Sequence, residues 1–411
     1  MRLLISVAVF LGVVSASPGL GERAACNSDN CLRAMLARPT PASEFCTTYT
    51  VAITSVALPT WASACSNLPS RISSACTCIN TAAPTPGPYA RVTPPSGAII
   101  VDNSKPYSYG SYPSFQAAVL ALSFTTTTPQ TIFIYPGTYT EQVYIPLLKS
   151  NLTIQGWTTD ARSYHANTAT ITFNLSRLNA TNNDLTATVR NWNPNTKFYN
   201  LNIKNTFGHV NTNGQNLALS AQVTNQGYYG VQLWGYQDTV LANRGNQLYA
   251  KSLIVGAIDF IFGQYSTAWF EQVDIRTIAE GWVTASGRLD AATNAWFVIN
   301  NSTVAGIDSS IPAGSNALGR PWKAFARVVF QYTYLTDVIA KEGWKPWSTV
   351  PGSENTVNST LAEYNNTGPG SVSGGSGPRA AFGLQLDAPI TPETVLGDNW
   401  KGEWYVDADY L

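Results

Sequence analysis

The chain has 411 residues, of which 44% are hydrophobic and only 12% are charged, and its formal net charge is zero. Its length allows one large domain or two smaller ones. The even balance of 24 basic and 24 acidic residues argues against a nucleic-acid partner, which would require a basic stripe. Aromatic residues make up 11% of the chain, which suits a sugar polymer that stacks on aromatic faces, but equally an extracellular β-rich protein of another function.

Residues 1–16 have the pattern of a secretory signal peptide. Arg2 supplies the positive start, an apolar run follows from Leu3 to Val14, and the small residues Ser15 and Ala16 precede a cleavage point. The run is too short to span a bilayer comfortably, and no other segment approaches a spanning length. We therefore expect a secreted, extracellular protein without a membrane segment.

All six cysteines lie before residue 80, at positions 26, 31, 46, 65, 76 and 78. An even number in an exported chain predicts three disulfides, and the sequence does not choose among the 15 pairings. Zinc is the less favoured alternative, because the spacing of Cys76 and Cys78 is not typical of zinc ligands and no histidine lies nearby. Residues 17–80 are therefore predicted to form a small stapled module with helical pieces, for example over 29–36. Seven glycosylation sequons suit a secreted glycoprotein, at Asn151, Asn174, Asn179, Asn300, Asn301, Asn358 and Asn365.

The segment 81–97 contains five prolines and predicts a stiff, extended linker. Residues 98–411 contain no cysteine and are predicted to form one domain. Short runs of β-branched and aromatic residues between Gly, Pro, Asn or Asp predict strands, for example at 131–135, 142–145, 152–154 and 295–299. One amphipathic helix is predicted over 114–122, where Phe115, Val119 and Leu122 recur at helical spacing. Strands do not alternate with helices, so a doubly wound α/β fold is not expected.

Between residues 200 and 275, short apolar runs recur roughly every 20–23 residues, a length typical of one coil of a parallel β-helix. Regularly spaced strands of a β-sandwich are the alternative interpretation. The pattern favours the solenoid only slightly.

The residues available for chemistry are narrowed by what the sequence lacks. The chain has two histidines, His165 and His209, and no G-x-S-x-G elbow, so a Ser-His-Asp hydrolase is not expected. It has no His/carboxylate cluster at metal-ligand spacing and no phosphate-binding glycine loop. A reaction would therefore use carboxylates, arginine, amides and aromatic side chains, with no metal and no cofactor.

Two aspartates lie in strongly apolar surroundings. Asp238 follows L-W-G-Y-Q, and Asp259 lies within G-A-I-D-F-I-F-G. A carboxylate in such a stretch is costly unless it is paired or hydrogen-bonded. A turn or cap residue is the structural alternative, but the residues around Asp259 are typical of a strand. We interpret both aspartates as candidate functional residues.

The spacing of these residues suggests a column on a solenoid. Gln215, Gln237 and Asp259 follow one another at intervals of 22 residues, and Asp238 precedes Asp259 by 21. Equivalent positions on adjacent coils stack about 4.8 Å apart, so the first three are predicted to form a column. Neighbours in a regular strand point to opposite faces, so Gln237 and Asp238 can share a site only at a strand end or bulge.

Such a column could carry out acyl transfer. A carboxylate can act as nucleophile, two amides can stabilise an oxyanion, and a second carboxyl with a raised pKa can act first as acid and then as base. A cation is needed to keep the nucleophile ionised. The best candidate is Arg320 in L-G-R-P-W, because a guanidinium binds a carboxylate bidentately, although a surface or packing role is the alternative.

These segments together resemble pectin methylesterases (pectinesterases) of the secreted fungal type, over residues 98–411. The motifs that carry the resemblance are G-T-Y-T-E at 137–141, G-Y-Q-D-T at 235–239, G-A-I-D-F-I-F-G at 256–263, L-G-R-P-W at 318–322, G-W-K-P-W at 343–347 and E-Y-N-N-T-G-P-G at 363–370. One five-residue match has little weight, but several in family order are specific.

The resemblance implies an all-β fold, a right-handed parallel β-helix solenoid, and hydrolysis of the methyl esters of pectin (homogalacturonan) by a monomer without cofactor or metal. The implied catalytic residues are Asp259 as nucleophile, Asp238 as acid/base, Gln237 and Gln215 as oxyanion-hole amides and Arg320 as partner of the nucleophile. The implied substrate-binding residues are Trp322, Trp344, Phe260 and Tyr139. For the two tryptophans, the residues alone favour core packing.

The sequence departs from the family pattern at two places. Many members, particularly from plants, have Leu-Tyr after Q-D-T and Asn-Ala after D-F-I-F-G, where this chain has Val240-Leu241 and Gln264-Tyr265. Both changes concern groove preference rather than a reacting group. The alternatives are a pectin-cleaving lyase or glycosidase on the same solenoid, or a non-catalytic polysaccharide-binding β-helix. The glutamine column and L-G-R-P-W fit neither a glycosidase with paired carboxyls nor a calcium-dependent lyase.

Overall fold

The computed structural model describes residues 30–36, 42, 45–46, 59–66, 68, 71–72, 75–76, 88–105 and 110–411. The chain divides into two compact units, Met1–Thr85 and Pro86–Leu411. The predicted signal peptide and two of the cysteines, Cys26 and Cys78, lie outside the described residues.

The first unit is helical where it is described. It contains helix α1 (Asn30–Leu36) and the 3-10 helix η2 (Thr60–Cys65). Disulfides join Cys31 to Cys65 and Cys46 to Cys76, and all four half-cystines are buried in the core of the unit. A unit this small gains much of its stability from such cross-links. The predicted disulfide-stapled helical module is confirmed for these residues.

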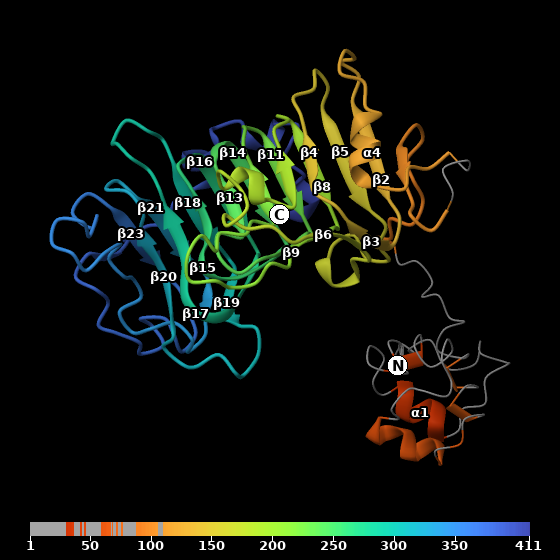
Figure 1. Ribbon diagram of the computed structural model, residues 1–411. Coiled ribbons are helices and arrows are strands. Elements are labelled where there is room, and N and C mark those ends of the chain that lie inside the picture. The colour runs from red at the N-terminus through yellow and green to blue at the C-terminus, as the bar shows by residue number, and fades with distance from the viewer. Residues whose placement is uncertain are drawn as a thin grey trace, which may run out of the picture. The chain divides into compact units, whose positions relative to one another are not determined.

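The second unit is built from two long sheets that run side by side (Figure 1). The first has 11 strands, in the order β1 (Ile99–Val101), β2 (Gln130–Ile134), β5 (Leu152–Gly156), β8 (Thr196–Tyr199), β11 (Gln226–Tyr229), β14 (Arg244–Ala250), β16 (Tyr265–Glu271), β18 (Trp296–Asn300), β21 (Arg327–Gln331), β23 (Thr360–Tyr364) and β24 (Gly383–Gln385).

The second sheet has 13 strands. Nine follow the order β3 (Gly137–Thr140), β6 (Ala169–Phe173), β9 (Asn202–Asn205), β12 (Gln232–Trp234), β15 (Leu253–Gly263), β13 (Val240–Ala242), β10 (Leu219–Ala221), β7 (Val189–Asn191) and β4 (Val143–Ile145). The other four continue from β15, namely β17 (Asp274–Ser286), β19 (Thr303–Gly306), β20 (Asn316–Pro321) and β22 (Tyr334–Leu335). Successive coils pair in parallel, for example β11 with β14 and β15 with β17, so the unit is a right-handed parallel β-helix, as predicted.

Helices are few and short in this unit. Helix α4 (Phe115–Leu120) occupies the middle of the predicted 114–122 helix, and Ser114 caps it by accepting a hydrogen bond from the Ala117 N–H group. The other helices are η4 (Tyr164–Ala166), η5 (Asp184–Thr186), α5 (Pro392–Leu396), η6 (Trp400–Gly402) and η7 (Ala408–Tyr410). The four strands named from the sequence correspond to β2, β4, β5 and β18, so these predictions are confirmed within one or two residues.

From β8 onward, successive coils turn at a residue with left-handed backbone, at Asn200, Gly230, Lys251, Gln272, Asn301, Tyr332 and Asn365. The coils from Gly230 to Lys251 and from Lys251 to Gln272 are each 21 residues long, whereas their neighbours are longer. The predicted period is therefore correct only for these central coils. Short coils leave no room for inserted loops, so this is where the two sheets are covered least.

Aromatic side chains stack along the core in the direction of the solenoid. Phe198, Tyr228, Tyr249 and Phe270 lie on successive coils with ring centroids 5.2, 4.8 and 4.7 Å apart. The parallel register places equivalent residues above one another, so one aromatic position per coil produces a continuous stack.

The stack makes a testable contribution to stability. Replacing the fully buried Phe270 with Ala removes a ring from the middle of the stack, and we expect it to lower the free energy of unfolding by about 3–5 kcal/mol. The control Leu147→Ala changes a side chain that is 68% exposed and should stay within about 0.5 kcal/mol of the parent. Urea titration followed by tryptophan fluorescence measures both, and equal effects of the two variants would contradict the packing argument.

The predicted linker does not extend to residue 97. Arg91 exchanges two backbone hydrogen bonds with Thr158, at 2.9 and 3.0 Å, and its side chain donates to Asn200 at 2.7 Å. Tyr89 accepts a backbone hydrogen bond from Ala161, and its ring lies 3.6 Å from the guanidinium of Arg162. Residues from Tyr89 onward therefore belong to the β-helix unit.

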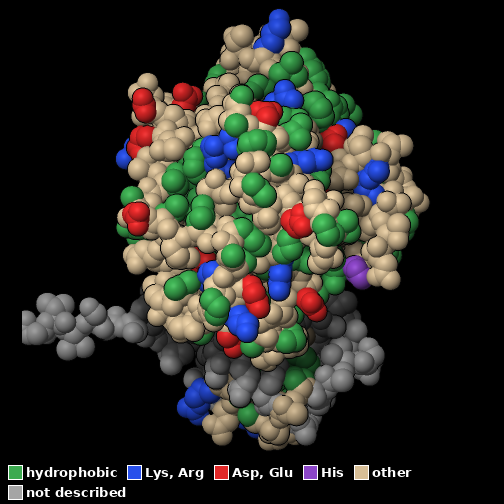
Figure 2. Space-filling view, turned by 90° about the vertical axis from the view of Figure 1, so that its left-hand side faces the viewer, with side chains coloured by type: hydrophobic (Ala, Val, Ile, Leu, Met, Phe, Trp, Pro, Cys, Tyr) green, Lys and Arg blue, Asp and Glu red, His purple; other side chains and the backbone are tan. Residues whose placement is uncertain are grey.

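The surface reflects the low charge of the chain. On the face shown in Figure 2, acidic and basic side chains are interspersed among neutral and hydrophobic ones, and several of opposite sign lie close together. Within the described ranges, no helix has the length and apolar character needed to cross a bilayer.

Candidate active site

Asp259 and Arg320 form the centre of the site. Asp259 lies in β15 and Arg320 in β20, and both strands pair with β17. Arg320 donates from Nε to Oδ1 of Asp259 at 2.9 Å and from Nη2 to Oδ2 at 2.6 Å. The Asp259 side chain is only 7% exposed, so this bidentate pair forms largely away from water. The predicted contact is present, and the catalytic roles stay predictions.

The backbone around these residues departs from a regular strand. Asp259 has a left-handed φ of 51°, and the pairing of β15 with β17 shifts register on both sides of Ile258. The shift breaks the alternation of side chains, which turns Asp259 away from the core. Gly319 allows β20 to come close enough for Arg320 to reach it, because a Cβ atom at 319 would lie 2.0 Å from Oγ1 of Thr284.

Asp238 lies in the turn between β12 and β13, also with a left-handed φ, of 64°. Its N–H donates to the carbonyl of Ile258 at 2.9 Å, which sets Asp238 beside Asp259 on the adjacent coil. Its Oδ2 accepts a hydrogen bond from Nδ2 of Asn183 at 2.9 Å. The expectation that Asp238 could share the site only from a strand end is thus met.

The two carboxyl groups differ in their electrostatic surroundings. Burial raises the pKa of Asp238 well above its usual range, the neighbouring charge of Asp259 raises it further, and Arg320 and Asn183 oppose the shift. Burial also raises the pKa of Asp259, but there the hydrogen bonds and the charge of Arg320 act by direct contact. Asp259 is therefore the group that loses its proton first, and Asp238 is the group that keeps it.

The raised pKa of Asp238 predicts a pH-dependent change in stability. Between the unfolded and the folded pKa of this carboxyl, the folded state binds more protons, so the parent loses stability as the pH rises through that range. Asp238→Asn carries no titrating proton and escapes the loss. At pH 7.5 we expect the free energy of unfolding of the variant to exceed that of the parent by on the order of 1 kcal/mol or more, which thermal melting would show as a higher melting temperature. At pH 4 the two proteins should be closer in stability. The prediction would be contradicted if the stability of the variant, measured relative to the parent at the same pH, were lower at pH 7.5 than at pH 4.

Gln215 and Gln237 lie next to each other on adjacent coils, as predicted. The predicted continuation of this column from Gln237 to Asp259 is wrong. Gln237 pairs with Ile258 rather than Asp259, because the coil is 21 residues long at this point. The N–H of Asn216 donates to the carbonyl of Gln237 at 3.0 Å, which sets Gln215 level with Gln237 on the preceding coil. Oε1 of Gln215 is buried without a hydrogen-bond partner in the described part of the chain.

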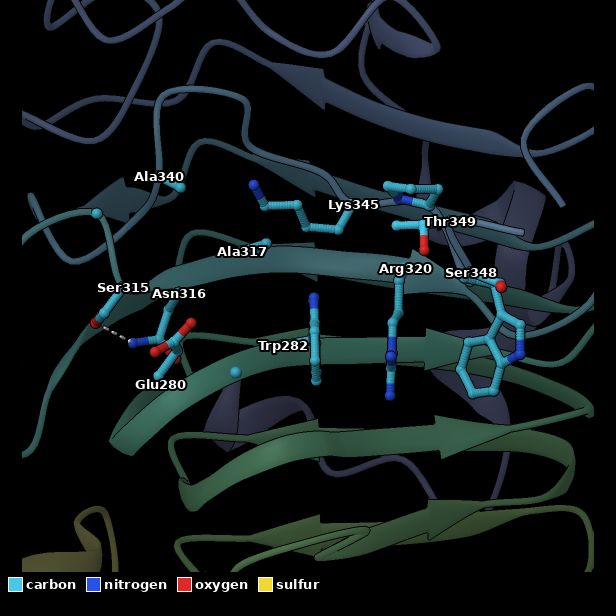
Figure 3. A pocket seen from close by; sticks show the side chains of 14 residues that line it. Glu280, Trp282, Ser315, Asn316, Ala317, Arg320, Ala340, Lys345, Ser348 and Thr349 are labelled. Carbon is cyan, nitrogen blue, oxygen red and sulfur yellow. Dashed lines mark hydrogen bonds between the residues drawn. The ribbon is translucent and has the colours of Figure 1, made fainter. Parts of the chain in front are cut away.

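Two hollows are lined by residues that bind the acidic pair. The first, of about 450 Å³, is lined by Arg320, by the aromatic side chains of Trp282 and Trp347, and at its far end by Glu280 and Lys345. Figure 3 shows Trp282 and Arg320 projecting side by side from neighbouring strands, with Glu280 and Ser315 beyond Trp282. The guanidinium of Arg320 lies 3.7 Å from the ring of Trp282 and 4.4 Å from that of Trp347. Both rings cover it from solvent.

The second hollow, of about 520 Å³, lies over the preceding coils. It is lined by Asn183, which is bonded to Asp238, and by Phe262 and Trp322, whose rings are 6.2 Å apart. Trp322 therefore lies where a substrate-binding residue was predicted. The two hollows, which we call the groove, have aromatic walls, and each contains a hydrogen-bond partner of one aspartate, Arg320 for Asp259 and Asn183 for Asp238.

Three of the predicted substrate-binding residues are corrected by their burial. Trp344 is 1% exposed and packs edge-on against Phe330 in the core. Phe260 is fully buried and belongs to the main hydrophobic core of the solenoid. Tyr139 is 3% exposed and donates a hydrogen bond to the carbonyl of Tyr135 at 2.9 Å. None of the three can contact a polymer in the groove.

The sequence reasoning also missed three groove residues. Trp347 is the second tryptophan of G-W-K-P-W, and only the structure distinguishes it from the buried Trp344. Trp282 and Asn183 belong to no motif, and nothing in the sequence pattern singles them out. Searching only the described residues, no group of three His, Cys, Asp or Glu side chains is arranged to hold a metal ion.

The fold and the site define a parallel β-helix protein with two neighbouring buried aspartates, one paired with an arginine, beside hollows with aromatic walls. The family model for pectinesterase matches residues 103–377. A pectinesterase of Aspergillus niger is 46% identical over 326 residues, covering 78% of this chain and 94% of that protein, and one of Aspergillus aculeatus is 46% identical over 327 residues, covering 78% and 95%. The crystal structure of a pectin methylesterase from Aspergillus niger superposes with a TM-score of 0.69 at 34% identity, covering 78% of this chain and all of that one. This chain belongs to the pectinesterase family, whose members are carboxylic ester hydrolases.

Proposed function

We propose that this protein hydrolyses the methyl esters of pectin to methanol and free carboxylate, through an acyl-enzyme intermediate on Asp259. The observation that carries the proposal is the bidentate contact of the buried Asp259 carboxylate with Arg320. A guanidinium in this position favours the ionised carboxylate, which is the form that can attack an ester carbon.

In the first half of the reaction, an oxygen of Asp259 forms a bond to the ester carbonyl carbon, and the carbonyl oxygen becomes an oxyanion. The side-chain amides of Gln215 and Gln237 donate hydrogen bonds to this oxyanion. The bond to the methoxy oxygen then breaks, Asp238 gives its proton to that oxygen, and methanol leaves. The raised pKa of Asp238 supports this role, because the group stays protonated where Asp259 does not.

In the second half, Asp238 is a carboxylate and takes a proton from water. The resulting hydroxide attacks the uronyl carbon of the anhydride, the bond to Asp259 breaks, and the product leaves as a carboxylic acid, which gives its proton to solvent and becomes the free carboxylate. Asp259 regains its charge beside Arg320 and Asp238 regains its proton, so that atoms and charges balance. The scheme requires no cofactor.

The groove suits a polymer of sugar rings. Trp282 and Trp347 on one side, and Trp322 on the other, where it packs against the buried Phe262, provide flat apolar faces near the reacting groups. We infer that homogalacturonan binds along this groove with its methyl ester between the two aspartates. We further infer that the enzyme acts as a monomer and is secreted. The apolar start of the chain and the disulfides of the first unit support secretion.

One assay tests the proposal against a lyase, a glycosidase and a non-catalytic binder. Highly methylated pectin is incubated with the protein, and methanol, chain length and unsaturated ends are measured together. Methanol release at constant chain length is the expected result. Chain shortening, unsaturated ends or no methanol would overturn the proposal.

A further inference from the structure

Asn183 connects the acid/base candidate to a loop that the reaction scheme leaves without a role. The loop 174–187 forms one wall of the second hollow and ends in the 3-10 turn η5. Asn183 donates from Nδ2 to Oδ2 of Asp238 at 2.9 Å. Its own carbonyl accepts hydrogen bonds from the N–H and the hydroxyl of Thr186, at 3.0 and 2.8 Å, so the residue is fixed on its backbone side.

The next residue anchors this loop to the solenoid. Asp184 accepts two hydrogen bonds from Arg190 at Oδ2, at 3.0 and 2.6 Å. At Oδ1 it accepts one from Ser220 at 2.8 Å and one from the Trp192 indole at 3.3 Å. Four donors on one half-buried carboxylate hold the loop against β7 and β10. The position of the Asn183 amide is therefore set by the fold and not by chance contact with Asp238.

The hydrogen bond distinguishes the two oxygens of Asp238. Oδ2 receives an N–H donor, so the exchangeable proton of the carboxylic acid belongs on Oδ1. After Asp238 has given up this proton, the same N–H group stabilises the carboxylate that remains. The contact thus makes proton donation easier without removing the proton in advance.

We propose that Asn183 is a positioning residue that keeps the transferable proton on Oδ1 of Asp238 and sets the upper pH limit of the enzyme, with Asp184 holding it in place. This inference rests on the proposed function. The charged groups facing Asp238 are Asp259 and Arg320 on the following coils. Arg177 and Asp184 line the hollow beside Asn183, and the ring of His209 lies 4.7 Å from that of Tyr236, two residues before Asp238.

The test is the pH profile of kcat/KM for methanol release by Asn183→Leu, in the full-length protein. The alkaline limb of this profile reports the group that must be protonated in the free enzyme. Without the amide donor the pKa of Asp238 rises, so the limb should move to higher pH, and kcat should fall about tenfold. Asn183→Asp, which places a second carboxyl against Asp238, should move the limb further in the same direction.

The matched control is Asn182→Ala, on the same wall of the hollow, whose side chain accepts a hydrogen bond from Leu185 N–H at 3.0 Å and does not touch Asp238. It should leave the limb in place. Equal losses at every pH in the Asn183 variants, or a limb that moves to lower pH, would overturn the inference. Absence of methanol release by the parent protein would instead reject the proposed function, so the two failures are distinguishable. Melting temperatures show whether each variant folds. If Asn183→Leu does not fold, the pH profile of Asn183→Asp, whose side chain has nearly the same shape as that of the parent, tests the inference alone.

Discussion

Asp259→Asn is expected to abolish turnover while leaving the fold intact. The amide has the shape of the carboxylate but cannot attack an ester carbon, and loss of a nucleophile that acts with its partners lowers kcat by on the order of 10⁴-fold or more. The left-handed backbone at position 259 is tolerated by asparagine, as it is at Asn200 and Asn225. Initial rates of methanol release and thermal melting measure the two parts of this prediction.

A matched pair elsewhere on the solenoid serves as control. Asp274 forms an ion pair with Arg276 on β17 at 2.8 Å, away from the two hollows, with one hydrogen bond from Nη2 of Arg276 to Oδ2 at 2.9 Å. Asp274→Asn should therefore change activity by less than twofold, while it breaks an ion pair of the same kind. Near-normal turnover by Asp259→Asn would remove Asp259 as the nucleophile, and equal losses in the two variants would point to stability rather than chemistry.

Arg320→Gln is expected to reduce kcat/KM by roughly 10²–10³-fold and to change its pH dependence. Arg320 supplies both hydrogen bonds to the Asp259 carboxylate and opposes the effect of burial on its pKa. Without the guanidinium the pKa of Asp259 rises, so the nucleophile is protonated up to a higher pH. The acidic limb of the kcat/KM profile should therefore move to higher pH, whereas the alkaline limb reports Asp238.

Arg320→Lys separates charge from geometry at the same position. The ammonium keeps the charge but cannot hold both carboxylate oxygens at once, so the limb should move less than in the glutamine variant. Arg276→Gln, which removes the partner of Asp274, is the control and should leave both limbs in place. An acidic limb that is the same in the parent and in Arg320→Gln would contradict the role given to Arg320.

The sequence predicts the reacting residues better than the walls around them. Asp238, Asp259 and Arg320 lie in specific motifs, and the contact of Arg320 with Asp259 is present as expected. The motif residues are constrained by chemistry and by the backbone together, as the left-handed aspartates and the close approach at Gly319 show. Such constraints leave a readable pattern.

The register of pairing between adjacent coils could not be predicted from the sequence. A 22-residue interval from Gln215 to Gln237 and again to Asp259 suggested a straight column, yet the coil after Gln237 is one residue shorter. A register shift of one residue places Ile258, instead of Asp259, opposite Gln237. Only the hydrogen bonds between coils fix which residue lies beside which.

The aromatic walls were equally hard to assign. Trp344 and Trp347 are three residues apart in one motif, and one packs in the core while the other covers Arg320. Trp282 and Asn183 come from segments without any motif, Trp282 through the pairing of β17 with β20 and Asn183 through a loop that hydrogen-bonds to Asp238.

The most direct test of the central claim is to trap the uronyl group on Asp259. Enzyme in excess is mixed with a short, fully methylated oligogalacturonate, quenched in acid within milliseconds, digested and analysed by mass spectrometry. The experiment uses the parent and Asp238→Asn, in which the first half of the reaction lacks its acid, so that the adduct forms more slowly, and the second half lacks its base, so that the adduct decays more slowly. The account predicts a uronyl adduct on the peptide that contains Asp259, formed in step with methanol release and longer-lived in Asp238→Asn. Methanol release without an adduct in both proteins, or an adduct on another residue, would contradict it.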